Sequence, residues 1–356
     1  MTLSPSQDAM SARWPLEYLT SAGPHAAPVV PLTWFLLGIS AAVILIFTVA
    51  VAWGIIVRRQ RVSRESLSTC SVENSSRGLS WVYIGMPLTL VTLIVALFWT
   101  MLVTGQIAQP ASPPTLAITV TGRQWWWQVN YPALPGGRPF ETANEIHIPV
   151  GQPVLVRLRG GDVIHSFWVP ALAGKTDTIP GRQNVTWLQA DRPGVYRGQC
   201  TEYCGAQHAN MGFLVFADPP AVFAAWRRNQ DRLASAVPAR PTTPRGMNAA
   251  ANDATRPALE GGNGQAIFAQ HCGGCHAIDG TDAHGYQPDG HGVRAPNLTH
   301  LMSRRTLAAV TLTNNTNNLA GWISDPQAQK PGVRMPITHL SGPELQAVVA
   351  YLKAQQ

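Results

Sequence analysis

The sequence predicts a multidomain membrane protein: a hairpin of two transmembrane helices, an all-β barrel and a small all-α domain. Two long uncharged segments lie in the first third of the chain, short apolar runs separated by Pro and Gly follow, and a helical pattern ends the chain. An apolar fraction of 46% with only 13% charged residues agrees with a chain that lies partly in lipid.

The uncharged segments, residues 32–57 and 81–105, each exceed the roughly 20 residues that cross a hydrocarbon core. Their length favours two transmembrane helices over buried core helices. The loop between them, residues 58–80, is rich in arginine, and the positive-inside rule places it in the cytoplasm. Cys70 falls in this reducing loop and receives no role.

Residues 1–31 lack the pattern of a signal peptide and are expected to form an external N-terminal segment. The N-terminus and everything after the second helix then lie on the periplasmic side of a bacterial-type inner membrane. The formal charge of +7 comes mostly from the cytoplasmic loop and from a later linker, while basic and acidic residues nearly balance in the folded units. The predicted folded domains therefore offer no basic surface of the kind that binds nucleic acid.

Residues 110–226 predict an all-β domain. Short runs with strand character alternate with Pro and Gly. The expected strands are residues 116–121, 145–149, 154–158, 163–169, 184–189, 194–199 and 212–217. Seven short strands over about a hundred residues indicate a β-sandwich or a Greek-key barrel.

Residues 227–260 are rich in Ala, Pro, Thr, Asn and Arg and predict a flexible linker. As a random coil it would span roughly 30 Å and hold the following domain at about millimolar effective concentration. Residues 261–356 form that domain, which ends in an amphipathic helix over residues 343–355.

The segment from Cys200 to Met211 concentrates metal-binding chemistry. Cys200, Cys204, His208 and Met211 place two thiolates, an imidazole and a thioether within twelve residues. Soft sulfur with nitrogen favours copper or zinc over hard cations. His165, in an otherwise apolar strand, is the natural second imidazole, because an unpartnered polar group there would be costly.

Three other interpretations of the two cysteines carry less weight. A disulfide leaves the adjacent His and Met unexplained. A mononuclear blue-copper site needs one cysteine, and a structural zinc site does not need Met211. A dinuclear copper site, suited to electron transfer, accounts for all of these residues.

The pattern Cys-x-Glu-x-Cys-x3-His-x2-Met, downstream of a Val-Ile-His-Ser-Phe strand, resembles the dinuclear copper A centre of cytochrome c oxidase subunit II. The resemblance covers residues 30–217 and implies a cupredoxin-like barrel. It implies that Cys200 and Cys204 bridge two coppers, and that terminal ligands come from His165, His208, Met211 and the Glu202 carbonyl. It also implies a magnesium ion, shared with subunit I, on the Glu202 side chain.

Two further segments belong to this resemblance. Trp125, in Gly-Arg-Gln-Trp-Trp-Trp, stands where electrons enter from cytochrome c in the family, although a tryptophan cluster is also ordinary core material. Asp177 and Arg182 lie in a loop similar to the one that faces subunit I and are candidates for supporting the ligands. One departure is Gly78, where the family commonly has a glutamate at the mouth of a proton pathway, and this puts proton uptake by that route in doubt.

Cys272-Gly-Gly-Cys275-His276 is the signature of covalent haem c attachment, in which two thioethers hold the porphyrin and the histidine reaches the iron. A thioredoxin-like motif would need a βαβ context and would leave His276 idle. We expect Met335 as the second axial ligand, because a thioether raises the haem potential; the competitors are Met302, His300 and His339. The surroundings resemble a class I cytochrome c domain.

Together these resemblances imply subunit II of a proton-translocating cytochrome c oxidase with a fused cytochrome c domain. The chain would pass electrons from haem c to copper A and on to subunit I, where oxygen is reduced, and would hold no complete oxygen-reducing site itself. Expected partners are subunit I, subunit III, membrane lipid and an external donor such as a cytochrome c or a quinol–cytochrome c reductase.

The nitric oxide reductases remain an alternative, whereas nitrous oxide reductases need a catalytic domain that this sequence lacks. A quinol oxidase subunit would lack the copper ligands, and a copper carrier or redox sensor would not explain the haem motif.

Overall fold

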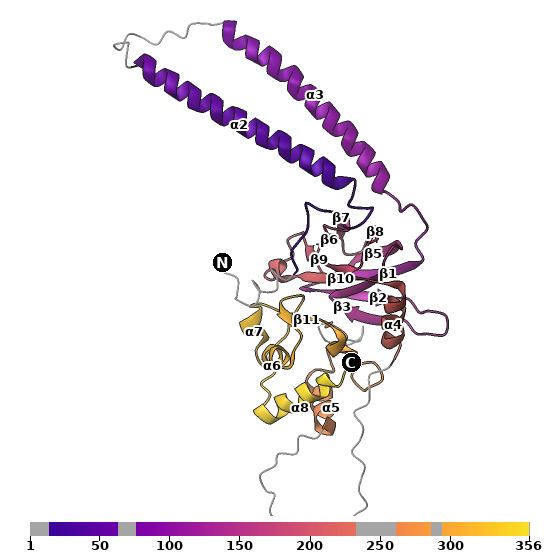
Figure 1. Cartoon of the computed structure of the whole chain (residues 1–356). Helices are drawn as coiled ribbons and strands as arrows, with labels where there is room; N and C mark the ends of the chain where they lie inside the picture. Colours follow the sequence, from indigo (N-terminus) through magenta and orange to yellow (C-terminus); the bar gives the residue numbers. More distant parts are fainter. Residues whose placement is uncertain (1–13, 63–75, 233–260, 286–293, 356) are drawn as a thin grey trace, which may run out of the picture.

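The computed structural model describes residues 14–62, 76–232, 261–285 and 294–355. Two long helices extend away from a β domain, and a helical domain lies against the opposite end of that β domain (Figure 1). The sequence predicts a hairpin of two long apolar helices, an all-β domain and a small helical domain, and the structure contains all three.

The two long helices are α2 (Val29–Val62) and α3 (Ser76–Ile107). Their most apolar parts, Val29–Val57 and Trp81–Ile107, are long and apolar enough to cross a membrane. Nearly all of their apolar side chains are exposed, as expected of surfaces that face lipid rather than a protein core. Phe35 and Trp99 contact each other across the hairpin, with ring centroids 5.0 Å apart.

The β domain consists of two five-stranded sheets, ordered β3-β2-β1-β5-β8 and β4-β10-β9-β6-β7. The strands are β1 (Leu116–Arg123), β2 (Trp126–Tyr131), β3 (Phe140–Ala143), β4 (Glu145–Pro149), β5 (Val154–Gly160), β6 (His165–Val169), β7 (Ala173–Thr178), β8 (Gln183–Leu188), β9 (Gly194–Cys200) and β10 (Gly212–Asp218). Most neighbours are antiparallel, but β1 pairs with β5 and β10 pairs with β4 in parallel. Alternate residues of β5, namely Val154, Val156 and Leu158, enter the core between the sheets.

Three strands are absent from the sequence prediction, and each lacks the signal that strand prediction uses. β2 is buried on both faces, so it shows no alternation. β3 has only four residues, and β7, Ala-Gly-Lys-Thr-Asp-Thr, is poor in β-branched apolar residues.

Helix α4 (Pro220–Gln230) closes one end of the barrel. Its Trp226 ring stacks on His147, with centroids 4.1 Å apart, and the Arg227 guanidinium lies over the rings of Tyr131 and Phe140. The sequence places the start of the linker at residue 227, but these contacts extend the folded domain to the end of α4. The predicted linker from residue 233 to residue 260 lies outside the described residues.

The cytochrome domain is built from α5 (Gly261–His271), α6 (Thr316–Ser324), α7 (Pro326–Gln329) and α8 (Gly342–Lys353), with a small hairpin of β11 (Thr306–Leu307) and β12 (Leu312–Thr313). Helices α5 and α8 cross closely at Gly264, where an added Cβ would lie 2.2 Å from the Ala347 carbonyl oxygen. Phe268, Val348 and Tyr351 form the core around this crossing. A capping box between Ser341 and Glu344 begins α8.

Candidate metal centre and cofactor cavity

The sheet containing β6, β9 and β10 brings together all of the residues predicted to bind copper. Cys200 ends β9, Met211 directly precedes β10, and the loop between them carries Cys204 and His208. His165 begins β6, which pairs with β9 so that Phe167 lies opposite Cys200. Adjacent antiparallel strands therefore hold the loop over the His165 ring.

The sulfur atoms form the centre of this cluster. Cys200 Sγ lies 3.8 Å from Cys204 Sγ, which is 3.8 Å from Met211 Sδ. Each histidine presents its Nδ1 atom, His165 at 3.9 Å from Cys200 Sγ and His208 at 3.6 Å from Cys204 Sγ. The Glu202 carbonyl oxygen is 3.3 Å from Cys200 Sγ. Metal-ligand atoms of His165, Cys200 and Cys204 all lie within 4.8 Å of one another.

The centre is almost dry, because Cys200, Cys204, His165 and Met211 are buried. The indole N–H of Trp125 donates to the Cys204 carbonyl at 3.0 Å, and the Gln124 amide donates to the same oxygen at 2.6 Å. These contacts fix the loop on the side of the centre that faces the cytochrome domain.

Asp162 supports the histidine and was not singled out from the sequence. Its carboxylate contacts His165 Nε2 at 2.9 Å and accepts hydrogen bonds from the backbone N–H groups of Gln124 and Val163. Burial alone would raise the pKa of Asp162, but these hydrogen bonds outweigh it and hold the pKa below its usual value. The carboxylate three residues before a strand histidine is the one signal that could have found it.

The two cysteines do not titrate independently. The contact between their sulfur atoms lowers the pKa of Cys200 and raises the pKa of Cys204. Two thiolates, two imidazole nitrogens, a thioether and a carbonyl oxygen make a donor set that suits copper. The pair is not joined as a disulfide.

A second site lies in the cytochrome domain, where a large cavity opens toward the β domain. Its empty volume is about 1330 Å³, including solvent at its mouth. Cys272, Cys275, His276 and Met335 all line the cavity. Trp125 and Trp126 of the β domain also contribute to the wall.

His276 is oriented for coordination. Its Nδ1 atom donates to the Pro296 carbonyl at 2.7 Å, which leaves Nε2 as the free nitrogen. Burial lowers the pKa of His276 and favours the neutral ring that a metal requires. The loop that carries Met335 is held by Gln327, whose amide donates to the carbonyls of Val333 and Met335 at 2.8 and 2.9 Å.

The comparisons with known proteins match both soluble domains. Residues 134–217 match the family described as cytochrome C oxidase subunit II, periplasmic domain, and residues 262–356 match the cytochrome c family. Cytochrome c oxidase subunit 2 of Alkalihalophilus pseudofirmus is 34% identical over 284 residues, which cover 79% of this chain and 73% of that protein. The chain belongs to the cytochrome c oxidase subunit II family.

Two further relatives carry the same name. Cytochrome c oxidase subunit 2 of Bacillus sp. PS3 is 30% identical over 309 residues, covering 83% of this chain and 78% of that protein. A crystal structure of the periplasmic domain of subunit II from Bradyrhizobium japonicum is 35% identical and covers 34% of this chain and 96% of that one, with a TM-score of 0.32. The family and the two apolar helices make this subunit II a membrane-anchored component of a cytochrome c oxidase, an oxidoreductase, with an extracellular domain and a cytochrome c domain.

The other predicted site residues, Trp125, Asp177 and Arg182, lie at different distances from the metal centre. Trp125 lies between the metal centre and the cavity. Asp177 pairs in register with Ser166, next to His165, and Arg182 is exposed. Among the described contacts, neither the Asp177 side chain nor that of Arg182 reaches a predicted ligand, so their supporting role stays a prediction.

The competitors of Met335 do not line the cavity. The His300 ring contacts the Arg232 carbonyl at 3.0 Å, and the Met302 backbone N–H donates to the Gln355 carbonyl at 2.8 Å. His339 is exposed. A residue that sequence reasoning missed is Arg304, which lines the cavity and donates to the Asn297 carbonyl at 2.5 Å. Burial lowers the pKa of Arg304 to about 10.

Proposed function

We propose that this subunit II receives electrons at its own cytochrome domain and passes them through a dinuclear copper A centre to subunit I. There oxygen is reduced to water and protons are translocated. The observation that carries the proposal is the position of Trp125, whose ring lines the cytochrome cavity and whose N–H group bonds to the Cys204 carbonyl.

Copper A would be held by residues that already converge. Cys200 and Cys204 would bridge two coppers, and His165 Nδ1, His208 Nδ1, Met211 Sδ and the Glu202 carbonyl would be terminal ligands. When bound, this group supplies reversible one-electron transfer. The protein keeps the ligands dry and rigid through the surrounding strands and through Asp162, which limits rearrangement when the charge changes.

The haem would be attached through Cys272 and Cys275, with His276 and Met335 as axial ligands. Methionine and histidine together favour a high potential, which suits a domain that donates electrons. Arg304 is half-buried and lines the same cavity, where its guanidinium would pair with an acidic substituent of the porphyrin.

The side chain of Glu202 is half-exposed, while its carbonyl faces the metal centre. A carboxylate in this position can bind a hard cation at a subunit junction. We assign it the magnesium site shared with subunit I.

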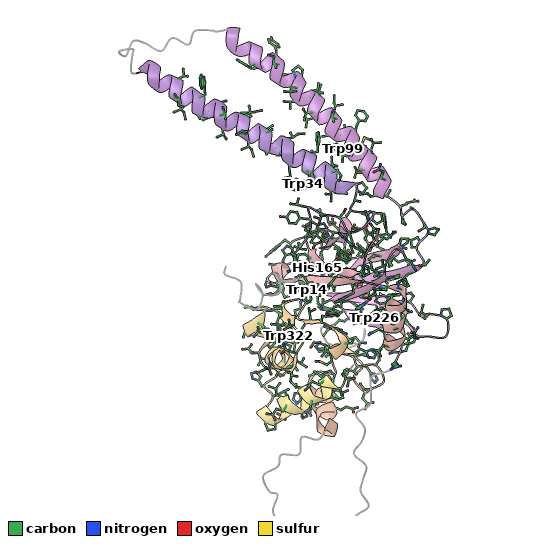
Figure 2. The ribbon with its side chains drawn as sticks, in the orientation of Figure 1. Trp14, Trp34, Trp99, His165, Trp226 and Trp322 are labelled. Carbon is green, nitrogen blue, oxygen red and sulfur yellow. The ribbon has the colours of Figure 1, made fainter. Side chains whose placement is uncertain are left out.

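The two apolar helices anchor subunit II next to subunit I and subunit III, with both soluble domains outside a bacterial inner membrane and the arginine-rich connection between the helices in the cytoplasm. The predicted loop over residues 58–80 is shorter in the structure, because α2 continues to Val62 and α3 begins at Ser76. The external donor would be a cytochrome c or a quinol–cytochrome c reductase. His165 marks the copper site in the β domain and Trp322 marks the cytochrome domain, which lies on the side away from the two helices (Figure 2). This order leaves the cytochrome domain outermost, where a donor can reach it.

The test is a stopped-flow reduction of the purified oxidase, comparing the wild type with a variant that combines Cys200→Ser and Cys204→Ser. In the variant the c-type haem should be reduced at the wild-type rate while the haems of subunit I stay oxidised. Cys70→Ser, at a cysteine outside both sites, is the matched control and should behave as the wild type. Reduction of the subunit I haems at an unchanged rate in the double variant would rule out the route.

A further inference from the structure

Two ionisable side chains are buried at the contact between the two soluble domains, and each makes hydrogen bonds to the other domain. The Glu145 side chain of β4 is 3% exposed, yet its hydrogen-bond partners all belong to the cytochrome domain. Its Oε1 atom accepts from the backbone N–H groups of Arg305 and Thr306, at 2.8 and 2.9 Å, and from the Thr306 hydroxyl at 3.0 Å. Without the cytochrome domain this carboxyl would lose all of these donors.

Lys330 provides the reciprocal contact from the cytochrome domain. Its ammonium group is 1% exposed and donates to the Asn210 carbonyl of the β domain at 2.8 Å and to the Ala308 carbonyl of its own domain at 3.0 Å. Lysine is almost never fully buried unless its charge is satisfied. Each domain therefore inserts one ionisable side chain into the other.

Between these contacts lies a strained turn. Ala308, Ala309 and Val310 have φ angles of 53°, 58° and 65°, three consecutive left-handed residues of which none is glycine. Left-handed backbone is unfavourable for residues with a side chain, and for β-branched Val310 the conformation is an outlier. Strain of this kind persists where the surroundings hold it and often marks a functional segment.

The strained turn is also the apolar part of the contact. Val310 is 4% exposed and forms a buried cluster with Leu214 and Phe216 of β10. The beginning of β10 approaches it so closely that a Cβ added to Gly212 would lie 3.4 Å from Val310 Cβ. A free cytochrome domain would expose this valine to water.

Polar contacts surround the centre of the interface. Arg294 pairs with Glu141 at 2.6 Å and Asp279 pairs with Arg138 at 2.6 Å. Gln207 donates to the Pro331 carbonyl at 2.7 Å, and Arg334 donates to the Gln124 side chain. A buried centre with a polar rim is the organisation of a specific protein interface.

From these contacts we infer that the cytochrome domain is stably docked on the β domain in one orientation, anchored by Glu145, Lys330 and the turn 308–310. Docking covers the Trp125 face with this chain's own domain, so a soluble cytochrome cannot bind there and must deliver its electron to the docked domain. The inference deepens the proposed function and rests on it only for this last consequence.

The test uses the full chain in the purified oxidase, with a recognition sequence for a site-specific protease inserted near residue 245. After cleavage, gel filtration over a range of concentrations measures how much of the c-type haem domain stays with the membrane part. The wild-type domain should remain bound at low micromolar concentration. Glu145→Ala should weaken retention by about 30-fold or more, since it leaves buried N–H groups unpaired, whereas Glu145→Gln, which keeps the accepting oxygen, should retain most of the binding.

Val310→Asn separates docking from folding. Asparagine tolerates the left-handed conformation better than valine does, so the cytochrome domain should stay folded with an unchanged haem spectrum, while the polar group weakens docking by about tenfold. Asp282→Asn and Lys353→Met, at exposed positions of the same domain, should leave retention unchanged.

Two results would overturn the docking inference: separation of the cleaved wild-type domain at every concentration, or wild-type retention in both Glu145→Ala and Val310→Asn. Neither result depends on electron transfer, so a failure of docking is distinguishable from a failure of the proposed route. Hydrogen exchange at the Arg305 and Thr306 amides of the uncut chain is a second readout, and it should accelerate in Glu145→Ala.

Discussion

Asp162 holds His165 by its Nε2 atom at 2.9 Å, while the other ring nitrogen, Nδ1, faces Cys200. The carboxylate thereby fixes both the tautomer and the orientation of the imidazole. Such partners of ligating histidines typically contribute 10- to 100-fold to metal affinity.

We expect Asp162→Ala to lower copper affinity by about this factor without unfolding the barrel. Competition with a copper chelator measures it, Asp191→Ala at an exposed position is the control, and unchanged affinity would contradict the assigned role of Asp162.

Met335 lines the same cavity as His276 and provides a thioether there. Met335→Leu should leave the haem covalently attached, because Cys272 and Cys275 are untouched, but should lower its reduction potential. Met302→Leu should leave the potential unchanged, because Met302 does not line the cavity. Potentiometric titration of the c-type haem measures the reduction potential of both variants. Equal shifts of this potential in the two variants would count against Met335 as a ligand.

The docking of the cytochrome domain should depend on pH through Glu145. Burial raises the pKa of this carboxyl from 4.5 to about 7 in the docked state, although Thr306, Arg304 and Arg305 act to lower it. Between these two values the docked state binds more protons than the free one. The contribution of Glu145 to docking should therefore fall as the pH rises from about 5 to 7, by up to roughly tenfold per unit, and should stay constant above that range.

The same cleaved-linker assay, repeated between pH 5 and pH 7, measures this slope. Glu145→Gln should abolish it, because the amide does not titrate. Burial lowers the pKa of Lys330 to about 7, so its contribution changes only above this range. A slope that persists in Glu145→Gln would assign the pH dependence to another group.

Helix α5 depends on Gly264 for its close approach to α8. An alanine there would place its Cβ 2.2 Å from the Ala347 carbonyl oxygen, and overpacking of this kind typically costs about 1 to 3 kcal/mol or more. Gly264→Ala should lower the melting temperature of the cytochrome domain. Gly321→Ala, in α6 where an added Cβ meets no atom within 4 Å, should raise it slightly through helix propensity. Calorimetry of the full chain compares the two, and equal melting temperatures would argue against a tight crossing.

Much of the site is predictable because its ligands lie close together in sequence. The segment from Cys200 to Met211 and the Cys272 to His276 motif carry their chemistry in their spacing, and His165 is conspicuous as a polar residue in an apolar strand. Asp162, Gln124 and Arg304 are not predictable in the same way, because their roles depend on contacts across strands or across a domain boundary.

The contact surface between the two soluble domains is the feature that the sequence predicts least well. Glu145 belongs to a correctly predicted strand, yet nothing in that strand indicates that its carboxyl will be covered by residues 160 positions away. The left-handed turn at Ala308 to Val310 contains no glycine or asparagine, the residue types from which such a turn is usually predicted. Both follow from how two separately folded domains meet, and local patterns do not encode that.

The most direct test of the electron route is a metal and haem analysis of the purified full-length subunit in its oxidase, combined with paramagnetic resonance. We predict one c-type haem per chain and two coppers in the β domain that share one unpaired electron, and this shared signal and both coppers should disappear in the variant that combines Cys200→Ser and Cys204→Ser. A single copper or none, together with a disulfide between Cys200 and Cys204, would contradict the copper A assignment.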